Sequence, residues 1–416
     1  MADIRPLRGV RFDRSVVGAL GPLLAPPYDV TAEHPTSGQF SVRNIESVNL
    51  GSGGDDHRLA ARRYRGWLAQ GVLRADHDPK VYVHRHRFKV NGISAERTGL
   101  LARVRLADWS ARIVLPHEAT TPGPRRERLQ RLRAVEANLS PLYFLYRDPS
   151  GEIRDLMTEY TADREALDEL DQSGASHGLA AIADPAFHAR LARLFADRTL
   201  FIADGHHRYE AALRYRDECR AASGTSVDSS PEFVLALLAA VEDPGVIVRP
   251  THRLLTGYPH RKGSSLLDVL EQWFVLRPST AGVALPGNDV IGRVIMSTDR
   301  NVWDILSRPD QRHLSLLVEG QGDARRALGV TAIEGVLGSA FASAPAGTAP
   351  RLLPIVDEAE ALLQVDRGEA DAVFLLPAPS LDLLLKVAEE GDLLPPKSTW
   401  FEPKAPAGLV ISDLRA

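Results

Sequence analysis

The sequence predicts a mixed α/β (α+β) protein, and three observations indicate this class. The segment Leu200–Leu213 combines a short apolar run, an Asp-Gly turn and a helix-compatible stretch. The segment Val81–Val90 alternates apolar and polar residues before Asn91-Gly92, which is a strong hairpin signal. Helix-like and strand-like segments also alternate from Leu266 onward. Neither an all-helical nor an all-strand fold accommodates these patterns.

The first 105 or so residues are predicted to be rich in strands and loops, with one helix over Leu59–Gln70. His84 and His86 share one face of the strand Val81–Val90, because side chains two residues apart point the same way. Arginines are interleaved with these histidines. This mixture favours a solvated face over a metal-binding pair.

The middle of the chain is predicted to alternate strands and helices, and Glu118 sits in the turn that leads into an arginine-rich helix. Residues 150–195 are predicted to be helical, with a polar loop over 171–178. The other predicted elements are the strand Leu100–Leu106, the helix Arg125–Ala137 and the strand Leu142–Tyr146.

The later part of the chain is predicted to form a separate α+β lobe beyond a soft boundary near Tyr258–Ser264. Small residues and prolines over Ala340–Pro350 indicate a linker within this lobe. The predicted elements from residue 222 onward are a polar loop over 222–231, a buried segment Phe233–Val241, a strand Val246–Val248, a helix Leu266–Phe274, a hairpin of Val290–Met296 and Val302–Leu306, and a unit over Leu352–Leu376.

Composition indicates a globular chain without a bias toward nucleic acid or membranes. The chain has 416 residues, is 44% apolar, and carries 50 basic and 54 acidic residues. It can therefore bury a large core, and no global field favours a polyanionic partner. The longest apolar run is well short of the ~20 residues that a membrane span needs. The N-terminus lacks the pattern of a signal peptide. We expect a cytoplasmic protein with no nucleic-acid or membrane partner, and leave the oligomeric state open.

Several common kinds of active site are not indicated by any motif. The sequence has no phosphate-binding loop of the Gly-x-x-x-x-Gly-Lys-Ser/Thr type and no Gly-x-Ser-x-Gly elbow. Gly51-Ser-Gly-Gly54 is too incomplete for a dinucleotide fingerprint. The single cysteine, Cys219, excludes an internal disulfide and a cysteine-built zinc site. We expect it to pack in the helix that follows the Asp-Gly turn.

The turn Asp204-Gly-His-His-Arg208 carries the strongest sign of chemistry. The first N–H groups of a helix have no internal partner and lie at the positive end of the helix dipole, so they suit a phosphate. Arg208 adds a bidentate fork, and Asp204 offers a carboxylate to a metal or a hydroxyl proton. His206 and His207 lie at the same turn.

Three further clusters combine a turn with anion-binding or proton-transferring groups. They are Pro26-Pro-Tyr-Asp-Val30, Pro116-His-Glu118 with Thr120, and Pro396-Lys-Ser-Thr399 with Lys404. Only six of the 50 basic residues are lysines, so the pair Lys397 and Lys404 stands out. A carboxylate base, an anion cradle and a lysine beside hydroxyls are the parts that phosphoryl transfer requires.

These four clusters, in this order, resemble the domain-of-unknown-function family 1015. Three of them also resemble motifs of archaeal free L-serine kinases, which belong to the ParB/sulfiredoxin-like superfamily. The resemblance implies that Glu118, with Asp204 and His206, is catalytic, and that Gly205, His207, Arg208 and His117 bind phosphate or nucleotide. It also implies substrate binding by Lys397, Ser398 and Thr399, to which we add Thr251, His252 and Arg253. Asp204 is then the implied Mg²⁺ ligand, and the donor is ATP, ADP or pyrophosphate.

The resemblance implies three domains and one reaction. We expect a β-rich extension over 1–104, a ParB/sulfiredoxin-like catalytic core over 105–260, and a C-terminal α+β lobe over 261–416 that closes the site. The expected reaction phosphorylates a small free amino acid, with L-serine as first candidate. Two alternatives stay open, namely a ParB-like nucleotide-hydrolysing switch and a non-catalytic ligand-binding regulator. The 85 residues between Glu118 and Asp204 exceed those of the compact kinase.

Overall fold

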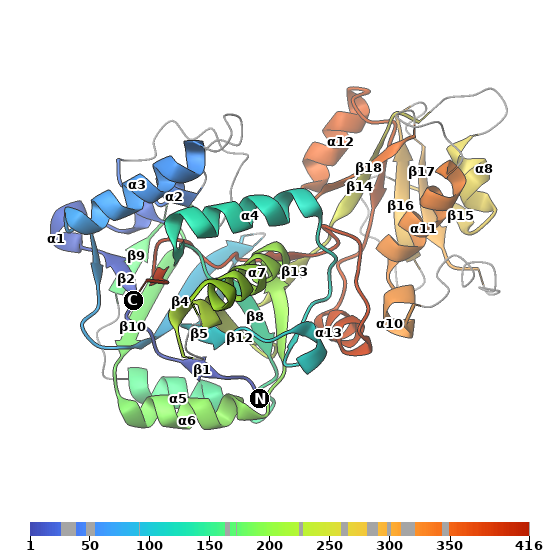
Figure 1. Cartoon of the computed structure of the whole chain (residues 1–416). Coiled ribbons are helices and arrows are strands. Elements are labelled where there is room, and N and C mark those ends of the chain that lie inside the picture. The colour runs from blue at the N-terminus through green and yellow to red at the C-terminus, as the bar shows by residue number, and fades with distance from the viewer. Residues whose placement is uncertain are drawn as a thin grey trace. The chain divides into compact units, whose positions relative to one another are not determined.

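We describe the protein from a computed structural model (Figure 1). The structure describes residues 1–25, 39–46, 55–90, 92–162, 167–171, 173–223, 228–258, 265–280, 290–297, 301–308, 321–342 and 349–415. The chain divides into two compact units. The first unit comprises Met1–Pro116, Thr120–Ile247 and Phe401–Ala416, and the second comprises His117–Ala119 and Val248–Trp400.

The first unit is built on one mixed sheet, in which nine strands of the described chain take part. Their order is β6-β11-β8-β12-β5-β4-β10-β9, and β1 pairs with β5 outside this path. The strands are β1 (Ile4–Arg5), β4 (Val81–Val90), β5 (Ile93–Arg105), β6 (Val114–Leu115), β8 (Leu142–Tyr146), β9 (Leu167–Leu170), β10 (Ser176–Ile182), β11 (Leu200–Asp204) and β12 (Phe233–Ala240).

The first unit also contains seven described α-helices. They are α1 (Arg14–Val17), α2 (Arg43–Glu46), α3 (Asp55–Ala69), α4 (Pro122–Val135), α5 (Glu152–Thr161), α6 (Pro185–Ala196) and α7 (His206–Ser223). Helices α5 and α6 lie side by side, and their apolar residues join the core under alternate residues of the central strands (Figure 1). Phe144 and Ile202 belong to this core and are fully buried. Their neighbours along the strands, such as Tyr143 and Ala203, point to the opposite face.

Shorter elements complete the first unit. Strands β2 (Val10–Phe12) and β3 (Leu73–Ala75) form one small ladder, and β7 (Ala137–Asn138) and β21 (Ser412–Asp413) form another. A second apolar cluster, which includes Tyr64 and Trp67 of α3, lies around β2 and β3. Three 3₁₀ turns are η1 (Gly21–Leu23), η2 (Trp109–Ala111) and η3 (Ser230–Glu232). The chain passes between the units before and after His117–Ala119, and again within β13 (Ile247–Arg249) and β20 (Trp400–Glu402).

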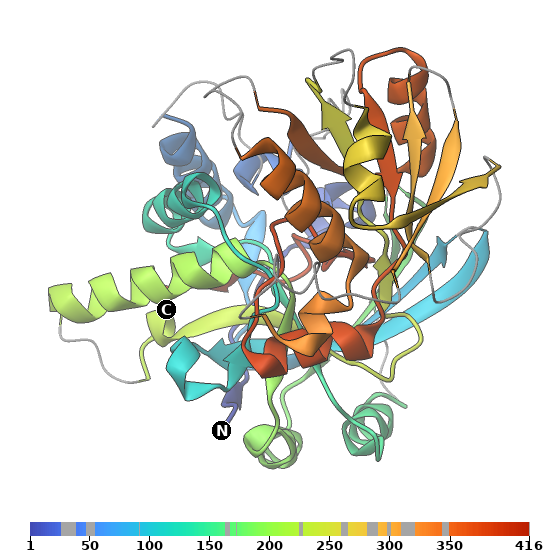
Figure 2. The same ribbon diagram turned by 90° about the vertical axis from the view of Figure 1, so that its right-hand side faces the viewer.

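The second unit is a six-stranded sheet with helices on both faces (Figure 2). The strand order is β15-β17-β16-β19-β14-β18. Helix α12 packs Ala361 and Val365 on one face, and Arg253 on the opposite face bonds to Glu334 of α11. The elements are β14 (His252–Thr256), α8 (Leu266–Glu271), β15 (Val275–Ser279), β16 (Val290–Met296), β17 (Val302–Leu306), α10 (Asp323–Arg326), α11 (Gly329–Phe341), β18 (Arg351–Ile355), α12 (Glu358–Asp366), β19 (Ala372–Leu375) and α13 (Leu381–Glu390).

The structure confirms the mixed α/β class and the locally encoded elements. Strands β4 and β5 form the predicted hairpin, with Val90 paired to Ile93. The strand, turn and helix at Leu200–Leu213 are also present as β11 and α7. The division differs from the expected one, because β4 and β5 pair in the same sheet as β8, β11 and β12. Residues 1–104 therefore share a sheet with the segment expected to form the core.

Two predictions about the region around β10 are wrong. Residues 171–178 are not a polar loop throughout, because Ser176–Gly178 pair with Arg87–Arg85 as the start of β10. The face of β4 that carries His84 and His86 is not solvated, since these side chains are 0% and 5% exposed. The interleaved arginines lie on the other face. Strand alternation shows which residues share a face, but the surrounding fold decides which face is covered.

None of the described helices has both the length and the apolar character needed to cross a membrane.

Candidate functional site

The predicted strand-to-helix turn holds a carboxylate between two cations of the first unit. Asp204 ends β11, Gly205 follows with φ of +105°, and α7 begins at His206. Lys404 Nζ lies 2.6 Å from Asp204 Oδ1, and Arg208 Nη2 lies 2.6 Å from Asp204 Oδ2. Both bonds are charge-assisted and short, so they fix the two cations at the start of α7. Two cations at a helix N-terminus form an arrangement that can receive an anion.

Arg208 is buried and anchored on its other side. Its Nη1 donates to Ser140 Oγ at 3.0 Å and to the carbonyl of Pro141 at 2.7 Å. Behind Ser140 lies Glu46 of α2, which is 1% exposed. Burial raises the pKa of the Glu46 carboxyl, while a hydrogen bond with Ser140 and the charge of Arg208 oppose this shift. Glu46 is thus a buried acid in the same network as the predicted phosphate-binding arginine.

Hydrogen bonds to His207 and Glu210, in the first turns of α7, connect the N-terminus of α4 to that of α7. The backbone N–H of Thr121, the N-cap of α4, donates to His207 Nε2 at 2.9 Å. Thr120 Oγ1 donates to Glu210 Oε2 at 2.8 Å, and Arg125 bonds to the same oxygen at 2.9 Å. The orphan donors of one helix start are therefore partly satisfied by the first turn of the other.

The donor set at this turn does not fit a preformed Mg²⁺ site. Both oxygens of Asp204 already accept from cations. No cluster of three histidine, cysteine or acidic donors lies at this turn among the residues that the structure describes. Mg²⁺ in proteins is often held by one or two carboxylates together with substrate phosphates. We therefore assign no chemical step to a metal here, and Asp204 as a metal ligand stays a prediction.

Gly205 should not tolerate a side chain. A Cβ at this position would lie 3.0 Å from Arg208 Nη2, and its positive φ disfavours any L-residue. We expect Gly205→Ala to lower the free energy of unfolding by about 1–3 kcal/mol. Urea unfolding followed by circular dichroism measures this change. The matched control is Gly66→Ala in α3, where a Cβ meets nothing within 4 Å and should stabilise the helix. Equal stability of the parent and Gly205→Ala would contradict the strain argument.

The second unit brings the predicted base together with the predicted substrate segment. Glu118 is 9% exposed and bridges Leu394 through its backbone. Its Oε2 accepts the backbone N–H of Ser398 at 3.2 Å and lies 3.5 Å from Thr399 Oγ1. His117 Nε2 lies 2.9 Å from the same threonine hydroxyl. His117 and Glu118 thus form one cluster with Ser398 and Thr399, which follow about 280 positions later in the sequence. The Glu118 carboxylate in this cluster can accept a proton.

Arg253 supports the Lys397–Ser398 segment from the sheet. It is 1% exposed, and its Nε pairs with Glu334 Oε1 at 2.6 Å. Its Nη1 donates to the carbonyl of Lys397 at 3.1 Å, and its Nη2 lies 3.4 Å from Ser398 Oγ. Lys397 itself has φ of +60° and an exposed side chain. The turn is held by its backbone, which leaves the Lys397 ammonium at the surface of this unit.

His252 is bonded to backbone in this structure, and Thr251 lies beside it. The Leu376 N–H donates to His252 Nδ1 at 3.1 Å, so this nitrogen carries no proton. Burial, aided by the charges of Arg249 and Arg253, lowers the pKa of His252 to about 4. Thr251 is buried, and its hydroxyl has no hydrogen-bond partner among the described residues. Substrate binding by either side chain stays a prediction.

The low pKa of His252 makes stability depend on pH. Its ordinary value of 6.5 applies to the unfolded chain, so the unfolded state binds more protons between pH 6.5 and 4. Stability should fall as the pH drops through this window, by at most about 3 kcal/mol from this residue. His252→Asn keeps an acceptor for Leu376 without titrating. Urea unfolding from pH 7 to 4 should give a shallower fall for His252→Asn than for the parent or for the exposed control His77→Asn. Parallel curves would contradict this assignment.

Part of this network carries no signal in the sequence. Glu46, Ser140, Thr121 and Glu210 were not singled out, and their contacts come from elements that are distant in sequence. Lys404 belongs to the fourth predicted cluster and is one of the scarce lysines, but the sequence assigns it no role of its own. The cluster Pro26-Pro-Tyr-Asp-Val30 lies outside the described residues, as does Gly51–Gly54. Burial raises the pKa of the Cys219 thiol, which packs in α7 as expected and is not activated as a nucleophile.

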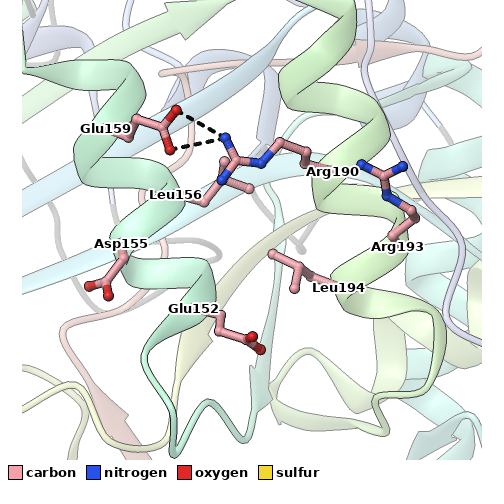
Figure 3. Close-up of a pocket in the computed structure, with 7 residues that line it drawn as sticks. All are labelled: Glu152, Asp155, Leu156, Glu159, Arg190, Arg193 and Leu194. Atoms are coloured by element: carbon pink, nitrogen blue, oxygen red, sulfur yellow. Dashed lines mark hydrogen bonds and ion pairs between the residues drawn. The ribbon is translucent and has the colours of Figure 1, made fainter.

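A pocket of about 370 Å³ between α5 and α6 contains none of the predicted site residues (Figure 3). Its charged lining includes Glu159, whose carboxylate oxygens lie 2.9 and 3.0 Å from Arg190 Nη1. Ion pairs of this exposed kind contribute little and serve no evident chemistry. A smaller cavity of about 40 Å³ is lined partly by Arg208 and Ser140, so it adjoins the network around Asp204.

Comparison with models of known protein families identifies the family of this chain. The family described as "Protein of unknown function (DUF1015)" matches residues 4–331. The chain belongs to this family. The match confirms the resemblance to the domain-of-unknown-function family 1015, and membership of the ParB/sulfiredoxin-like superfamily stays a prediction. No functionally curated protein matches this DUF1015 chain.

Solved structures with a similar arrangement include a free serine kinase in complex with AMP, at 12% identity and a TM-score of 0.38. The match covers 70% of this DUF1015 chain and 83% of the kinase. A conserved hypothetical protein from Pyrococcus furiosus matches at 13% identity and a TM-score of 0.38, covering 73% and 93% of the two chains. SbnI from Staphylococcus aureus matches at 10% identity and a TM-score of 0.36, covering 73% and 82%. At these values the likeness carries no argument about activity.

Proposed function

We propose that this DUF1015 protein is a phosphotransferase that phosphorylates the hydroxyl group of a small free amino acid, with L-serine as first candidate. The donor is ATP, ADP or pyrophosphate. The observation that carries the proposal is the cluster around Glu118, where a buried carboxylate meets Ser398 and Thr399. The motif resemblance likewise implies that this glutamate is the base and this segment the acceptor site.

The proposed chemistry uses the two clusters for different tasks. Glu118 accepts the proton of the acceptor hydroxyl, whose oxygen then attacks the terminal phosphorus of the donor. The bond between that phosphorus and the bridging oxygen breaks, and the shortened donor leaves. Lys404 and Arg208 neutralise phosphate oxygens at the start of α7, where backbone N–H groups add to the positive potential.

The sequence itself links the two clusters closely along the chain. Glu118 is separated from Thr120 by one residue, and Thr399 from Lys404 by four. The polypeptide thus passes twice, over a few residues, from the Glu118 cluster to the groups that hold Asp204 and α7. This proximity in sequence supports our proposal that both clusters serve one reaction.

A product assay tests the proposal. Purified protein is incubated with Mg²⁺, each of the three donors and a panel of free amino acids, and the products are identified by mass spectrometry. We expect an O-phosphorylated amino acid together with one equivalent of the shortened donor. Release of inorganic phosphate without a phosphorylated acceptor would instead support a nucleotide-hydrolysing switch. Absence of any turnover with measurable donor binding would support a ligand-binding regulator.

A further inference from the structure

Three histidines gather on one covered face of the first unit's sheet, and none of them belongs to the residues assigned above. His84 and His86 lie two positions apart on β4, and His177 lies on the neighbouring β10. His177 pairs in register with His86, and Leu179 with His84. The side chains are 0%, 5% and 1% exposed, respectively. Among the described residues, this is the one group of three donors close enough to share a metal ion.

The rings of these histidines lie in contact. His84 Nε2 and His177 Nδ1 are 3.0 Å apart, and the ring centroids of His86 and His177 are 4.1 Å apart. His177 Nε2 lies 3.1 Å from Asp171 Oδ2, which is an acceptor when ionised. This bond places the proton of His177 on Nε2 and leaves the Nδ1 lone pair directed at His84. A carboxylate on the outer nitrogen is the usual partner of a metal-binding histidine.

Several nitrogens of the cluster lack hydrogen bonds. Neither ring nitrogen of His86, nor Nδ1 of His84, has a partner among the described residues. A buried polar atom without a partner is costly, so a ligand that pairs with these nitrogens would be stabilising. Burial lowers the pKa of both His84 and His86, which favours the unprotonated form of these two rings that can act as a ligand.

We infer that His84, His86 and His177 form a binding site for a divalent transition-metal ion of the zinc class, with His177 oriented by Asp171. Imidazole ligands suit Zn²⁺, and three histidines leave a fourth position open. Their donor atoms all lie within 4.8 Å of one another, whereas tetrahedral Zn²⁺ needs about 3.3 Å between nitrogens. A ring movement of about 1.5 Å closes the difference. Metal binding would join β4 to β10 through their side chains.

Arg97 is a cation that faces this cluster, and its positive charge affects which fourth ligand a bound metal ion would take. It pairs with His86 across β4 and β5, is fully buried, and stacks over the Tyr143 ring at 4.7 Å. Its positive charge opposes a metal ion, while the Asp171 carboxylate favours one. Nε and Nη2 of Arg97 have no partner among the described residues. An anion such as hydroxide or chloride in the fourth position would reduce this repulsion.

Metal titration of the full chain tests this site. The protein is purified without a histidine tag, stripped with a chelator and titrated with Zn²⁺ by calorimetry and with Co²⁺ by visible absorption. We expect one equivalent to bind in the parent and a Co²⁺ spectrum of tetrahedral type. His77→Ala, which removes an exposed histidine, should bind as the parent does. His86→Ala should lose the site, and Asp171→Asn should weaken binding about 10- to 100-fold.

Each outcome decides the inference. A parent that binds neither ion in the micromolar range overturns it, as does a folded His86→Ala that binds one equivalent. If circular dichroism shows that His86→Ala does not fold, Asp171→Asn decides the matter. A metal affinity of Asp171→Asn equal to that of the parent would contradict the inferred site, because the site depends on Asp171 to orient His177. Stabilisation of the parent by chloride or phosphate but not by Zn²⁺ would show an anion site and would likewise overturn the inference.

Discussion

Replacement of Glu118 by glutamine should lower the kcat of phosphoryl transfer by about 10²–10⁴ and leave donor affinity nearly unchanged. The loss is the usual contribution of a positioned general base. Glutamine keeps an oxygen that can accept the Ser398 N–H, which Glu118 accepts at 3.2 Å. The fold of the second unit should therefore persist. Quench-flow or steady-state assays with the preferred donor and acceptor measure kcat, and calorimetry measures donor binding.

Glu360→Gln is the matched control for this variant. It makes the same chemical change on α12, where the side chain is exposed and bonds only to Gln364 among the described contacts. We expect parental kinetics from it. A Glu118→Gln enzyme that retains parental kcat would remove Glu118 from the mechanism. A variant that loses donor affinity as strongly as kcat would make Glu118 a binding residue instead of a base.

Elements encoded by neighbouring residues were predictable from the sequence. The Asn91-Gly92 pair specified the hairpin of β4 and β5, because few residue types other than glycine adopt a positive φ such as the +80° of Gly92. The apolar run before Asp204 and the helix-compatible residues after Gly205 specified β11 and α7. The functional reading of Glu118 with Ser398 and Thr399 came from motif resemblance, since no local pattern joins segments so far apart in sequence.

Features that depend on distant segments were not predictable. His177 lies in a stretch rich in turn residues, and it becomes part of β10 because β4 and β9 offer adjacent strands. The burial of His84 and His86 likewise depends on what covers one face of β4. Glu46 joins the network through Ser140 and Arg208, which are contributed by other parts of the chain. Tertiary packing, not local propensity, decides each of these positions.

Substitutions at Lys404 and Asp204 should have opposite effects on donor binding. Lys404→Met removes a charge-assisted partner at the start of α7 and should weaken donor binding about 10- to 100-fold. Asp204→Asn removes the carboxylate that Lys404 and Arg208 each approach at 2.6 Å. Without Mg²⁺, the freed cations should bind the donor at least as tightly as in the parent. Transfer should nevertheless fall about 10²-fold, because the cations lose the group that positions them.

Calorimetry with and without Mg²⁺ separates the two roles that Asp204 could have. If Asp204 is a counterion, the asparagine variant binds the donor well under both conditions. If it is a metal ligand, the variant loses affinity only when Mg²⁺ is present, because the donor then arrives with an ion that has lost its carboxylate. Glu159→Gln, which breaks an exposed ion pair with Arg190, controls for the change in net charge. Weaker binding by Asp204→Asn without Mg²⁺ would contradict the counterion role and would indicate a direct hydrogen bond from donor to carboxylate.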